Sequence, residues 1–427
     1  MTIQDIHNLF LKCSKVSIDT RRIEPNALFV AIKGERFDAN TFAAEALAKG
    51  AAYVIIDNKE YYIDDRTILV EDSLVALQEL AKYHRNYLKL PIVALTGSNG
   101  KTTTKELINV VLSKKFKTVA TVGNLNNHIG VPLTLLSFTK DTQIGIVEMG
   151  ANHQKEIEFL CEIAQPDYGF ITNFGKAHLE GFGGVEGVIK GKSEMYAYLK
   201  SKAKSVFVNL DDEIQNSKTA GIKRNTFSQN DKDADVFIDQ VSANPFVKIK
   251  ALGIEINSHL IGLYNANNIN AAITIGHHFG VPIVAIKEAI ESYIPENNRS
   301  QLLIKGGNEI ILDAYNANPS SMKVALENFI QLDKPNKVIV IGDMYELGVE
   351  SLEEHKEIVH FLDKNCSFEC HFIGKDFFKN EISKVNFKFY PTFEDFSESI
   401  SLLNWQNKTL LIKGSRGMAL ERTLEKL

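Results

Sequence analysis

Residues 91–116, PIVALTGSNGKTTTKELINVVLSKKF, predict a strand, a glycine-rich turn and a helix in that order. The apolar run at the start favours a buried strand, and Leu107, Val110 and Val111 then recur at the spacing of one helical face. Further β-type runs follow at QIGIVEMG, YGFITNFG and SVFVNLDD, with helical segments between them. Strands that alternate with helices predict parallel strands joined by crossovers, so we expect a doubly wound α/β domain around this stretch.

The glycine-rich turn departs from the general phosphate-binding loop, which needs Gly, four residues and then Gly-Lys-Ser/Thr. Leu95 occupies the position of the first glycine, whereas Gly97 lies closer to Gly100. These glycines still allow backbone amides to converge on an anion, and the following helix directs its N-terminal NH groups there. Lys101 adds a mobile positive charge, and the hydroxyl of Thr102 can reach Mg²⁺. We therefore interpret the turn as a nucleotide-phosphate loop rather than an ordinary strand-to-helix turn with an exposed lysine.

The composition is that of an ordinary globular protein with more than one domain. The 427 residues exceed the size at which a single core stops growing, so two or three domains are expected. A net charge of -5 argues against nucleic acid as the main partner. No apolar run approaches the length that spans a bilayer, which argues against a membrane role, and the first residues lack the pattern of a signal peptide. We expect a cytoplasmic protein.

The order of strand-like and helical segments predicts three domains. Residues 1–88 form a small α/β N-terminal domain that ends in a helix before Pro91. Residues 89–298 form the central domain with a mostly parallel sheet, to which DVFIDQVSANPFVKIKALGIEINSHLIG appends antiparallel hairpins. Residues 299–427 start a second, Rossmann-like α/β unit, whose strand candidates are NEIILDAY, KVIVIGDMYELG, ECHFIG, KFYPT and TLLIKGSRG.

The four cysteines do not form a disulfide framework. Cys366, Cys370 and His371 lie close together, but zinc sites usually need a second half of the motif. We favour a thiol and a histidine at a strand edge over a metal site.

The phosphate loop TGSNGKTT resembles the variant loop of the Mur ligases, ATP-dependent enzymes that build the peptide of the bacterial cell-wall precursor. Further matching segments occur along the whole chain: IDTRRIEPNALFVAIKGERFDAN, TVGNLNNHIGVPLTLL, EMGANHQKEIEFL, NFGKAHLEGFGG, LDAYNANPSSM, IGDMYELG and IKGSRG. The Asp-Asn-Pro-Arg motif of the diaminopimelate-adding relatives is absent.

The resemblance implies a reaction in which ATP phosphorylates a peptide carboxylate and an amine attacks the acyl phosphate. It further implies that D-alanyl-D-alanine is joined to UDP-N-acetylmuramoyl-tripeptide by a monomer with Mg²⁺ bound. Two alternatives stay open. A related ligase would add a single amino acid to a precursor or to folate, and a non-ligase P-loop ATPase or switch would leave GNLNNHIG and DAYNAN without a role.

The resemblance also implies a set of nucleotide contacts. Asn265 and Asn268 match adenine-side positions, although asparagines here could instead cap a helix. The family usually has histidine where this chain has Tyr264, and Pro-Glu-Asn-Asn-Arg replaces the family's approach to Arg299. The implied ATP contacts are Gly97, Ser98, Asn99, Gly100, Lys101, Thr102, Thr103, Asn265, Asn268, Arg299 and Asp313.

For Mg²⁺ the resemblance implies Thr102, Glu148, His178 and Lys192, the last carried as a carbamate formed from CO₂. A carbamate requires a neutral amine, hence a lowered lysine pKa. Lys190 lies two residues away and is the alternative position, and Glu148 could instead cap a helix. The implied catalytic residues are Lys101, His178 and Lys192.

For the two peptide substrates the resemblance implies contacts in all three domains. Arg416 could pair with the carboxylate of the dipeptide or be a plain surface arginine. The implied uridine-side residues are Asp19, Thr20 and Arg21. The implied sugar-phosphate residues are Asn124, Asn126, Asn127 and His128. The implied dipeptide-side residues are Tyr315, Asn316, Asn318 and Arg416.

Overall fold

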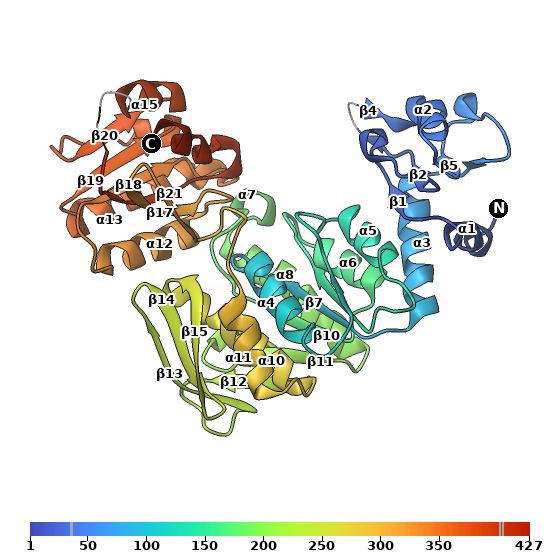
Figure 1. Cartoon of the computed structure of the whole chain (residues 1–427), viewed down its shortest axis with the longest axis horizontal. Coiled ribbons are helices and arrows are strands. Elements are labelled where there is room, and N and C mark those ends of the chain that lie inside the picture. Colours follow the sequence, from blue (N-terminus) through green and yellow to red (C-terminus); the bar gives the residue numbers. More distant parts are fainter. Residues whose placement is uncertain (35–36, 401–402, 404) are drawn as a thin grey trace.

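The computed structural model describes residues 1–34, 37–400, 403 and 405–427. Its main sheets occupy three successive parts of the chain, and Figure 1 shows them as three bodies, with the first and last as two arms above the middle one. The structure agrees with the expected three-part α/β organisation, while the limits at residues 88 and 298 stay predictions. Glu35 and Arg36 of the GERFDAN segment lie outside the described residues.

The N-terminal body holds a four-stranded parallel sheet in the order β1-β2-β5-β6. Helix α3 leads from it into the central body and packs against α1 on one side and α5 and α6 on the other. The strands are β1 (Val16–Ser17), β2 (Leu28–Val30), β3 (Lys33–Gly34), β4 (Phe37–Asp38), β5 (Tyr53–Ile56) and β6 (Thr67–Leu69). The helices are α1 (Ile3–Phe10), η1 (Thr20–Arg22), η2 (Ala39–Phe42), α2 (Ala43–Ala48), η3 (Lys59–Tyr61) and α3 (Ser73–Leu88).

The central body holds a nine-stranded sheet in the order β15-β14-β13-β12-β11-β10-β7-β9-β8. Neighbouring strands from β8 to β13 are parallel, and β13, β14 and β15 pair antiparallel, which confirms the predicted hairpins. The strands are β7 (Ile92–Thr96), β8 (Thr118–Ala120), β9 (Ile144–Glu148), β10 (Tyr168–Ile171), β11 (Ser205–Asn209), β12 (Lys223–Ser228), β13 (Val236–Ala243), β14 (Phe246–Ala251) and β15 (Ile254–Ile261).

Helices cover both faces of the parallel part of this sheet. Along β7, Val93 and Leu95 pack in one apolar cluster with α4, α10 and α11, whereas Ile92 and Ala94 pack in another with α5, α6 and α8. The alternation arises because successive side chains of a strand point to opposite faces. The helices are α4 (Lys101–Leu112), α5 (Gly130–Leu136), α6 (Glu156–Ala164), α7 (Leu179–Phe182), α8 (Val185–Ser201), α9 (Glu213–Lys218), η4 (Leu263–Asn265), α10 (Ala266–His278) and α11 (Ile283–Ser292). The doubly wound fold is confirmed.

The C-terminal body is a six-stranded sheet in the order β16-β17-β21-β18-β19-β20, parallel except for β16. Strand β16 was not predicted from the sequence; it turns into β17 through Gly306 and Gly307, both at positive φ. Such a glycine pair is typical of a two-residue hairpin turn. The strands are β16 (Gln301–Lys305), β17 (Asn308–Asp313), β18 (Lys337–Gly342), β19 (Glu369–Ile373), β20 (Phe387–Tyr390) and β21 (Thr409–Lys413).

Helices α12 and α13 of the C-terminal body pack on one another, and η5 packs against α7 of the central body. The helices are α12 (Pro319–Gln331), η5 (Gly348–Glu350), α13 (Ser351–Asn365), α14 (Lys375–Phe378), α15 (Phe393–Ile400), η6 (Arg416–Met418) and η7 (Leu420–Lys426). Among the described residues, every helix is too short or too polar to cross a bilayer.

Candidate active site

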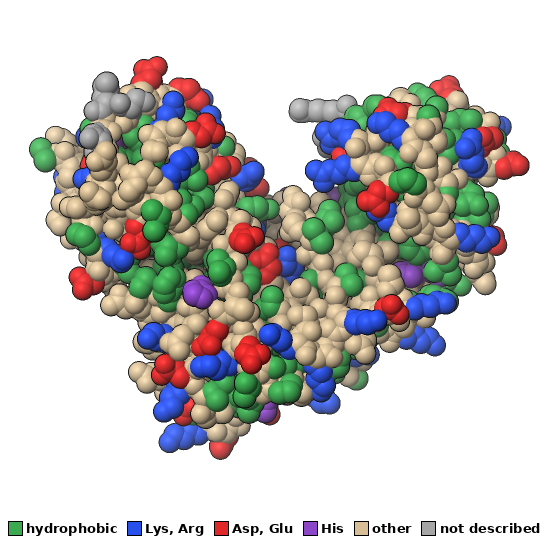
Figure 2. Space-filling model, in the orientation of Figure 1, with side chains coloured by type: hydrophobic (Ala, Val, Ile, Leu, Met, Phe, Trp, Pro, Cys, Tyr) green, Lys and Arg blue, Asp and Glu red, His purple; other side chains and the backbone are tan. Residues whose placement is uncertain are grey.

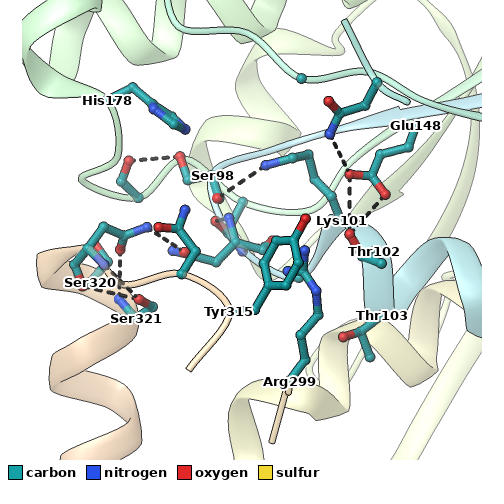
Figure 3. A pocket seen from close by; sticks show the side chains of 18 of the residues that line it. Ser98, Lys101, Thr102, Thr103, Glu148, His178, Arg299, Tyr315, Ser320 and Ser321 are labelled. Atoms are coloured by element: carbon teal, nitrogen blue, oxygen red, sulfur yellow. Dashed lines mark hydrogen bonds between the residues drawn. The ribbon is translucent and has the colours of Figure 1, made fainter. Parts of the chain in front are cut away.

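A cavity of about 790 Å³ lies where the central and C-terminal bodies meet, at the carboxyl ends of β7 and β9. This edge of a doubly wound sheet is where such folds bind ligands. Figure 2 shows the wide hollow between the two arms, and Figure 3 shows the cavity from nearby. Its lining includes the phosphate loop, Asn124 to His128 except Leu125, and Glu148 from the central body, together with Asp313, Tyr315, Asn316 and Asn318 from the C-terminal body.

The phosphate loop keeps its two glycines because neither site has room for a side chain. Gly97 has φ 145°, and a Cβ there would lie 1.9 Å from the Thr172 hydroxyl oxygen. Gly100 has φ 79°, and a Cβ there would lie 2.5 Å from the Asn268 side-chain oxygen. The loop therefore holds a backbone path that places the amides at the start of α4 on the cavity.

Lys101 supplies the positive charge of the loop. Its Nζ donates hydrogen bonds to the carbonyl oxygens of Gly97 at 2.8 Å and Ser98 at 3.4 Å. Burial lowers the pKa of Lys101, the charge of nearby Glu148 opposes that shift, and Arg299 adds to it. An incoming phosphate would offer the ammonium group a stronger acceptor than the loop carbonyls.

Glu148, at the end of β9, is the centre of a group of oxygen donors. It is 1% exposed, and its carboxylate accepts from the Thr102 hydroxyl at 3.0 Å and from the Asn126 amide at 2.9 Å. A buried carboxylate beside a hydroxyl and an amide fits the preference of Mg²⁺ for hard oxygen ligands. Thr102 and Glu148 are thus suited to hold the ion, whereas Asn126, expected on the sugar-phosphate side, contacts Glu148 directly.

Lys192 lies on α8 and is 1% exposed. Within the described residues its amine has no hydrogen bond or ion pair, and the ring of Phe182 lies 5.2 Å away. Burial lowers the pKa of Lys192 well below its ordinary value, and the like charge of Lys101 lowers it further. These surroundings favour a neutral amine. Lys190, the alternative, is exposed on the same helix.

His178 lies between the cavity and the C-terminal body. It adopts the left-handed conformation with φ 54°, at the start of α7. Its Nδ1 faces the carboxylate of Glu346, which lowers the pKa of Glu346. In Figure 3 His178 lies on the opposite side of the cavity from Glu148. The structure therefore pairs His178 with a carboxylate of the other body.

A second cavity of about 160 Å³ continues from His178 into the C-terminal body. Arg416 lines it, and its guanidinium pairs with Glu421 at 2.7 Å. Asn316 and Asn318 line both cavities, so the two cavities adjoin. Tyr315 lies in the main cavity with the guanidinium of Arg299 3.8 Å from its ring centroid.

The two asparagines expected near adenine make hydrogen bonds within the central body. The Asn268 amide donates to the side-chain oxygen of Asn265 at 2.9 Å, and its own oxygen accepts from Thr104 at 3.0 Å. Asn265 in turn donates to the carbonyl of Ile261 at 2.8 Å. Both line the cavity, but these side-chain groups already have partners that hold α10 against α4.

Arg299 lines the cavity between two residues, Asn298 and Ser300, that both have positive φ. Asn298 has φ 55°, a left-handed conformation that glycine and asparagine tolerate best. Tyr264, where the family usually has histidine, hydrogen-bonds Ser300 between their hydroxyl oxygens at 2.6 Å. The departures at Tyr264 and Asn298 still leave Arg299 in the cavity lining.

Asp313 ends β17 and is held from two sides. Its carboxylate accepts from the buried ammonium of Lys413 at 2.6 Å and from the backbone NH of Ser300 at 3.2 Å. This role of Lys413 was not predicted, although Lys413 lies in the segment IKGSRG that resembles the family. The available signal in the sequence was a lysine at the end of the predicted strand TLLIKGSRG.

The uridine-side candidates lie outside both cavities. Asp19 accepts a two-pronged contact from the guanidinium of Arg21 at 2.8 and 2.9 Å, and this hydrogen bonding lowers the pKa of Asp19 to about 2. Thr20 begins η1 between them.

Asn127, one of the sugar-phosphate candidates, lines the main cavity. Its side-chain oxygen accepts from the NH groups of Ile129 and Gly130 and so caps the turn before α5.

Direct contacts bridge the central and C-terminal bodies beside the cavity. The amide of Asn318 donates to the side-chain oxygen of Asn99 at 2.7 Å, which joins α12 to the phosphate loop. The ammonium of Lys176 pairs with Glu354 at 2.6 Å, and the backbone NH of Lys176 donates to Ser320 at 2.7 Å. Asn99, expected only as a nucleotide contact, is therefore also an interface residue.

Two other clusters contain metal-ligating residue types. The Sγ atoms of Cys366 and Cys370 lie 3.4 Å apart, whereas His371 hydrogen-bonds Glu369 and Tyr390. Neighbouring strand residues point to opposite faces, which separates His371 from Cys370 and disfavours a zinc site. Asp343, His355 and Asp376 also lie together, but their ligand atoms accept from backbone NH groups and from Ser351.

Comparison with known families covers most of the chain. Residues 12–85 match the Mur ligase family, catalytic domain; residues 95–276 match the Mur ligase middle domain; and residues 298–416 match the Mur ligase, glutamate ligase domain.

Two curated relatives match over nearly their whole length. The UDP-N-acetylmuramoyl-tripeptide–D-alanyl-D-alanine ligase of Bacillus subtilis is 34% identical, covering 96% of this chain and 92% of the relative. The ligase of the same name from Escherichia coli is 32% identical, covering 96% of this chain and 93% of the relative.

Solved structures agree with these matches. MurF from Acinetobacter baumannii superposes with a TM-score of 0.87 at 30% identity, covering 99% of this chain and 97% of that one. MurF ligase from Thermotoga maritima in complex with ADP superposes with a TM-score of 0.83 at 27% identity, covering 98% of this chain and 97% of that one.

Proposed function

The chain belongs to the Mur ligase family, and we infer from this premise that it joins D-alanyl-D-alanine to UDP-N-acetylmuramoyl-tripeptide at the expense of ATP. The observation that carries the reaction type is a single cavity lined by both the phosphate loop and the C-terminal body. A nucleotide phosphate and a peptide can meet there. The choice of dipeptide and precursor rests on the full-length relatives that carry this name.

The first step brings two anions together, a peptide carboxylate and the terminal phosphate of ATP. The carboxylate oxygen attacks phosphorus, the bond to ADP breaks, and an acyl phosphate forms. Lys101, Arg299 and the amides at the start of α4 lie where they can neutralise the charge on the phosphate oxygens. Thr102 and Glu148 would hold Mg²⁺, and the ion when bound adds positive charge to the same oxygens.

The second step needs a free amine beside the acyl phosphate. The amine of the dipeptide attacks the carbonyl carbon, phosphate leaves, and the ammonium formed at the attacking nitrogen loses a proton. The second cavity, which His178 and Arg416 line, would give the dipeptide a place on the C-terminal side. Arg416 would release Glu421 and pair with the dipeptide carboxylate.

Lys192 is proposed to act as a carbamate. Its amine is buried without a polar partner in the described residues, which fits a group that is completed by reaction. The neutral amine adds to CO₂ and releases one proton, leaving an anion that can help to position the metal. Glu156 lies near enough to act on the charge of Lys192 and lines the main cavity, so we propose it as a further residue of the metal site, one that was not predicted from the sequence.

Phosphate release measures the proposed function directly. We expect release from ATP only when UDP-N-acetylmuramoyl-tripeptide and D-alanyl-D-alanine are both present, with the tripeptide supplied in diaminopimelate and lysine forms. Turnover with a single amino acid instead of the dipeptide would indicate the related ligase class. Turnover with ATP alone would indicate a P-loop ATPase.

We also propose that the ligase is a monomer that acts in the cytoplasm, where ATP and the nucleotide precursor are found. Light scattering during gel filtration checks the first part: a mass near that of one chain is expected, and a stable dimer would contradict it.

A further inference from the structure

Glu106 follows the phosphate loop on α4 but does not line either cavity. Its carboxylate accepts from the Tyr293 hydroxyl at 2.5 Å and from the Asn297 amide at 3.0 and 3.2 Å. The ammonium of Lys105, which is 5% exposed, lies 3.6 Å from it. Glu106 therefore binds the chain that leaves the central body, with a buried positive charge beside it.

The segment that Glu106 holds, residues 293–300, is the linker between α11 and β16. Two residues after Asn297, the side chain of Arg299 extends into the cavity toward Lys101 and the ring of Tyr315 (Figure 3). Its Nε is buried and has no hydrogen-bond partner in the described part of the chain. The linker thus connects Glu106 to a guanidinium for which no ion pair is found among the described residues.

Both contacts to Glu106 are of the stronger kind, because a charged acceptor roughly doubles the strength of a hydrogen bond. Burial and the negative charge of Glu106 raise the pKa of Tyr293, so its hydroxyl stays a donor. Without these contacts residues 293–297 would regain backbone freedom, although Ser300 would keep its bonds to Tyr264 and Asp313. Fixing the freed residues again on binding would cost free energy for every residue ordered.

We propose that Glu106 is a positioning residue of the ligase reaction: it fixes the linker to α4 so that Arg299 is held ready for the nucleotide phosphates. The proposal rests on the proposed function for the identity of the nucleotide, ATP. It assigns a role in nucleotide binding to a residue that touches no substrate.

Packing of α4 against α11 does not require Glu106. The two helices already share a buried apolar cluster that includes Ile108, Val111, Ile286 and Ile290. On the surface, Lys114 and Glu288 join the same helices at 3.6 Å, with Glu288 62% exposed. This exposed pair makes Glu288→Ala a matched control for loss of a carboxylate between α4 and α11.

A double-mutant cycle tests the proposal. Binding of the β,γ-imido analogue of ATP is measured by calorimetry for wild type, Glu106→Ala, Arg299→Ala and the double variant. We expect Glu106→Ala to weaken binding on the order of tenfold. In the Arg299→Ala background the same change should have almost no further effect, because Glu106 acts through Arg299. Glu288→Ala should bind as wild type does.

Steady-state kinetics adds a readout that a purely structural role would not move. In Glu106→Ala the KM for ATP should rise while the KM for the UDP precursor stays unchanged. Additive losses in the cycle, or an unchanged affinity for the analogue, would overturn the proposal. If Glu106→Ala does not fold, Tyr293→Phe and Asn297→Ala remove the same hydrogen bonds from the linker side, and each is expected to weaken binding several-fold.

The ATP analogue binds without turnover, so the binding test does not depend on ligase activity. A wild-type protein that lacks ligase activity would contradict the proposed function and leave this test intact.

Discussion

The molecule has two joints: the interface between the N-terminal and central bodies, and the interface between the central and C-terminal bodies. Different kinds of contact hold the two together. At the first joint, α3 packs against α5 and α6 of the central body, and Leu77 and Leu80 of α3 are fully buried. Arg85 adds a half-buried ion pair with Asp167 at 2.8 Å. Separating these bodies would expose apolar surface, at about 25 cal/mol for each Å².

At the second joint, between the central and C-terminal bodies, polar contacts surround a cavity. Lys176 pairs with Glu354, and the lysine side chain is 41% exposed, so water can replace much of this contact. Asn318 and Asn99 would likewise exchange one hydrogen bond for others with water. We expect the first joint to stay rigid and the second to open and close around substrates.

The largest expected effect is a loss of turnover caused by a substitution in the phosphate loop, beside the second joint. Lys101→Ala should reduce turnover by about a thousandfold, because it removes a charge that stabilises the phosphate in the transition state. The melting temperature should change little, since Lys101 makes its hydrogen bonds to carbonyls of its own loop. Phosphate release and a thermal melt measure both. Near-normal turnover in a folded variant would exclude this loop as the ATP site.

The next effect concerns the buried amine of α8. Lys192→Ala should lower turnover by about a hundredfold, and acetate or formate should restore part of it by replacing the carbamate oxygens. Lys190→Ala, two residues away and exposed, is the matched control and should be mild. A dead Lys190→Ala with an active Lys192→Ala would move the carbamate to the other lysine.

A smaller effect tests closure itself. Glu354→Gln should raise the KM for D-alanyl-D-alanine a few-fold, since it weakens the pair with Lys176 that bridges the closed bodies. Small-angle scattering should show compaction of the wild type with an ATP analogue and precursor, and a less compact ensemble for Glu354→Gln. Identical scattering for both proteins with and without ligands would contradict the idea that this joint moves.

The smallest effect on turnover is expected for a substitution in the histidine pair at the first joint. This pair should instead make the free energy of unfolding depend on pH. His7 and His84 hydrogen-bond through ring nitrogens 3.0 Å apart, and His84 also bonds the carbonyl of Phe138. Burial, followed by the charge of His84, lowers the pKa of His7 to about 4, and burial lowers that of His84.

Because the pKa of His7 is lower in the folded protein, the unfolded chain binds more protons than the folded protein does as pH falls. The stability contributed by neutral His7 is therefore complete above its ordinary pKa of 6.5 and is lost as pH falls toward 4. Between pH 7 and pH 4.5 we expect a loss of about 2 kcal/mol in the free energy of unfolding. His7→Gln should remove much of this dependence in denaturant titrations, whereas a change at exposed His360 should not. An unchanged pH dependence in His7→Gln would show that this pair does not set it.

Local pattern predicted the fold well, because strands, helices and the phosphate loop depend on nearby residues. The run before Gly97 had to be a buried strand, and Glu148 ended another, so their meeting at one sheet edge followed from the parallel topology. Hairpin β16 was missed because its strand is short and partly exposed, with only Gly306 and Gly307 to indicate the turn.

Side-chain partners were harder to predict because they depend on contacts distant in sequence. Asn126 turned out to contact Glu148, and Asn99 to contact Asn318, yet neither partner is marked by spacing along the chain. Lys413 illustrates the same limit: only the fold shows that it faces Asp313, a hundred residues earlier. The substrate roles of these residues stay predictions.

The tight packing around the two glycines of the phosphate loop has a consequence for the synthesis of the protein. Thr172 packs against Gly97, and Asn268 packs against Gly100. Asn268 is translated long after the loop itself. A nascent chain that ends before residue 268 has every residue of the loop but lacks the side chain that packs against it. We therefore expect the ribosome-bound protein to gain nucleotide affinity only after α10 has emerged, which photo-crosslinking of an ATP analogue to stalled chains of increasing length would measure. The order of translation would then keep unfinished chains from binding ATP.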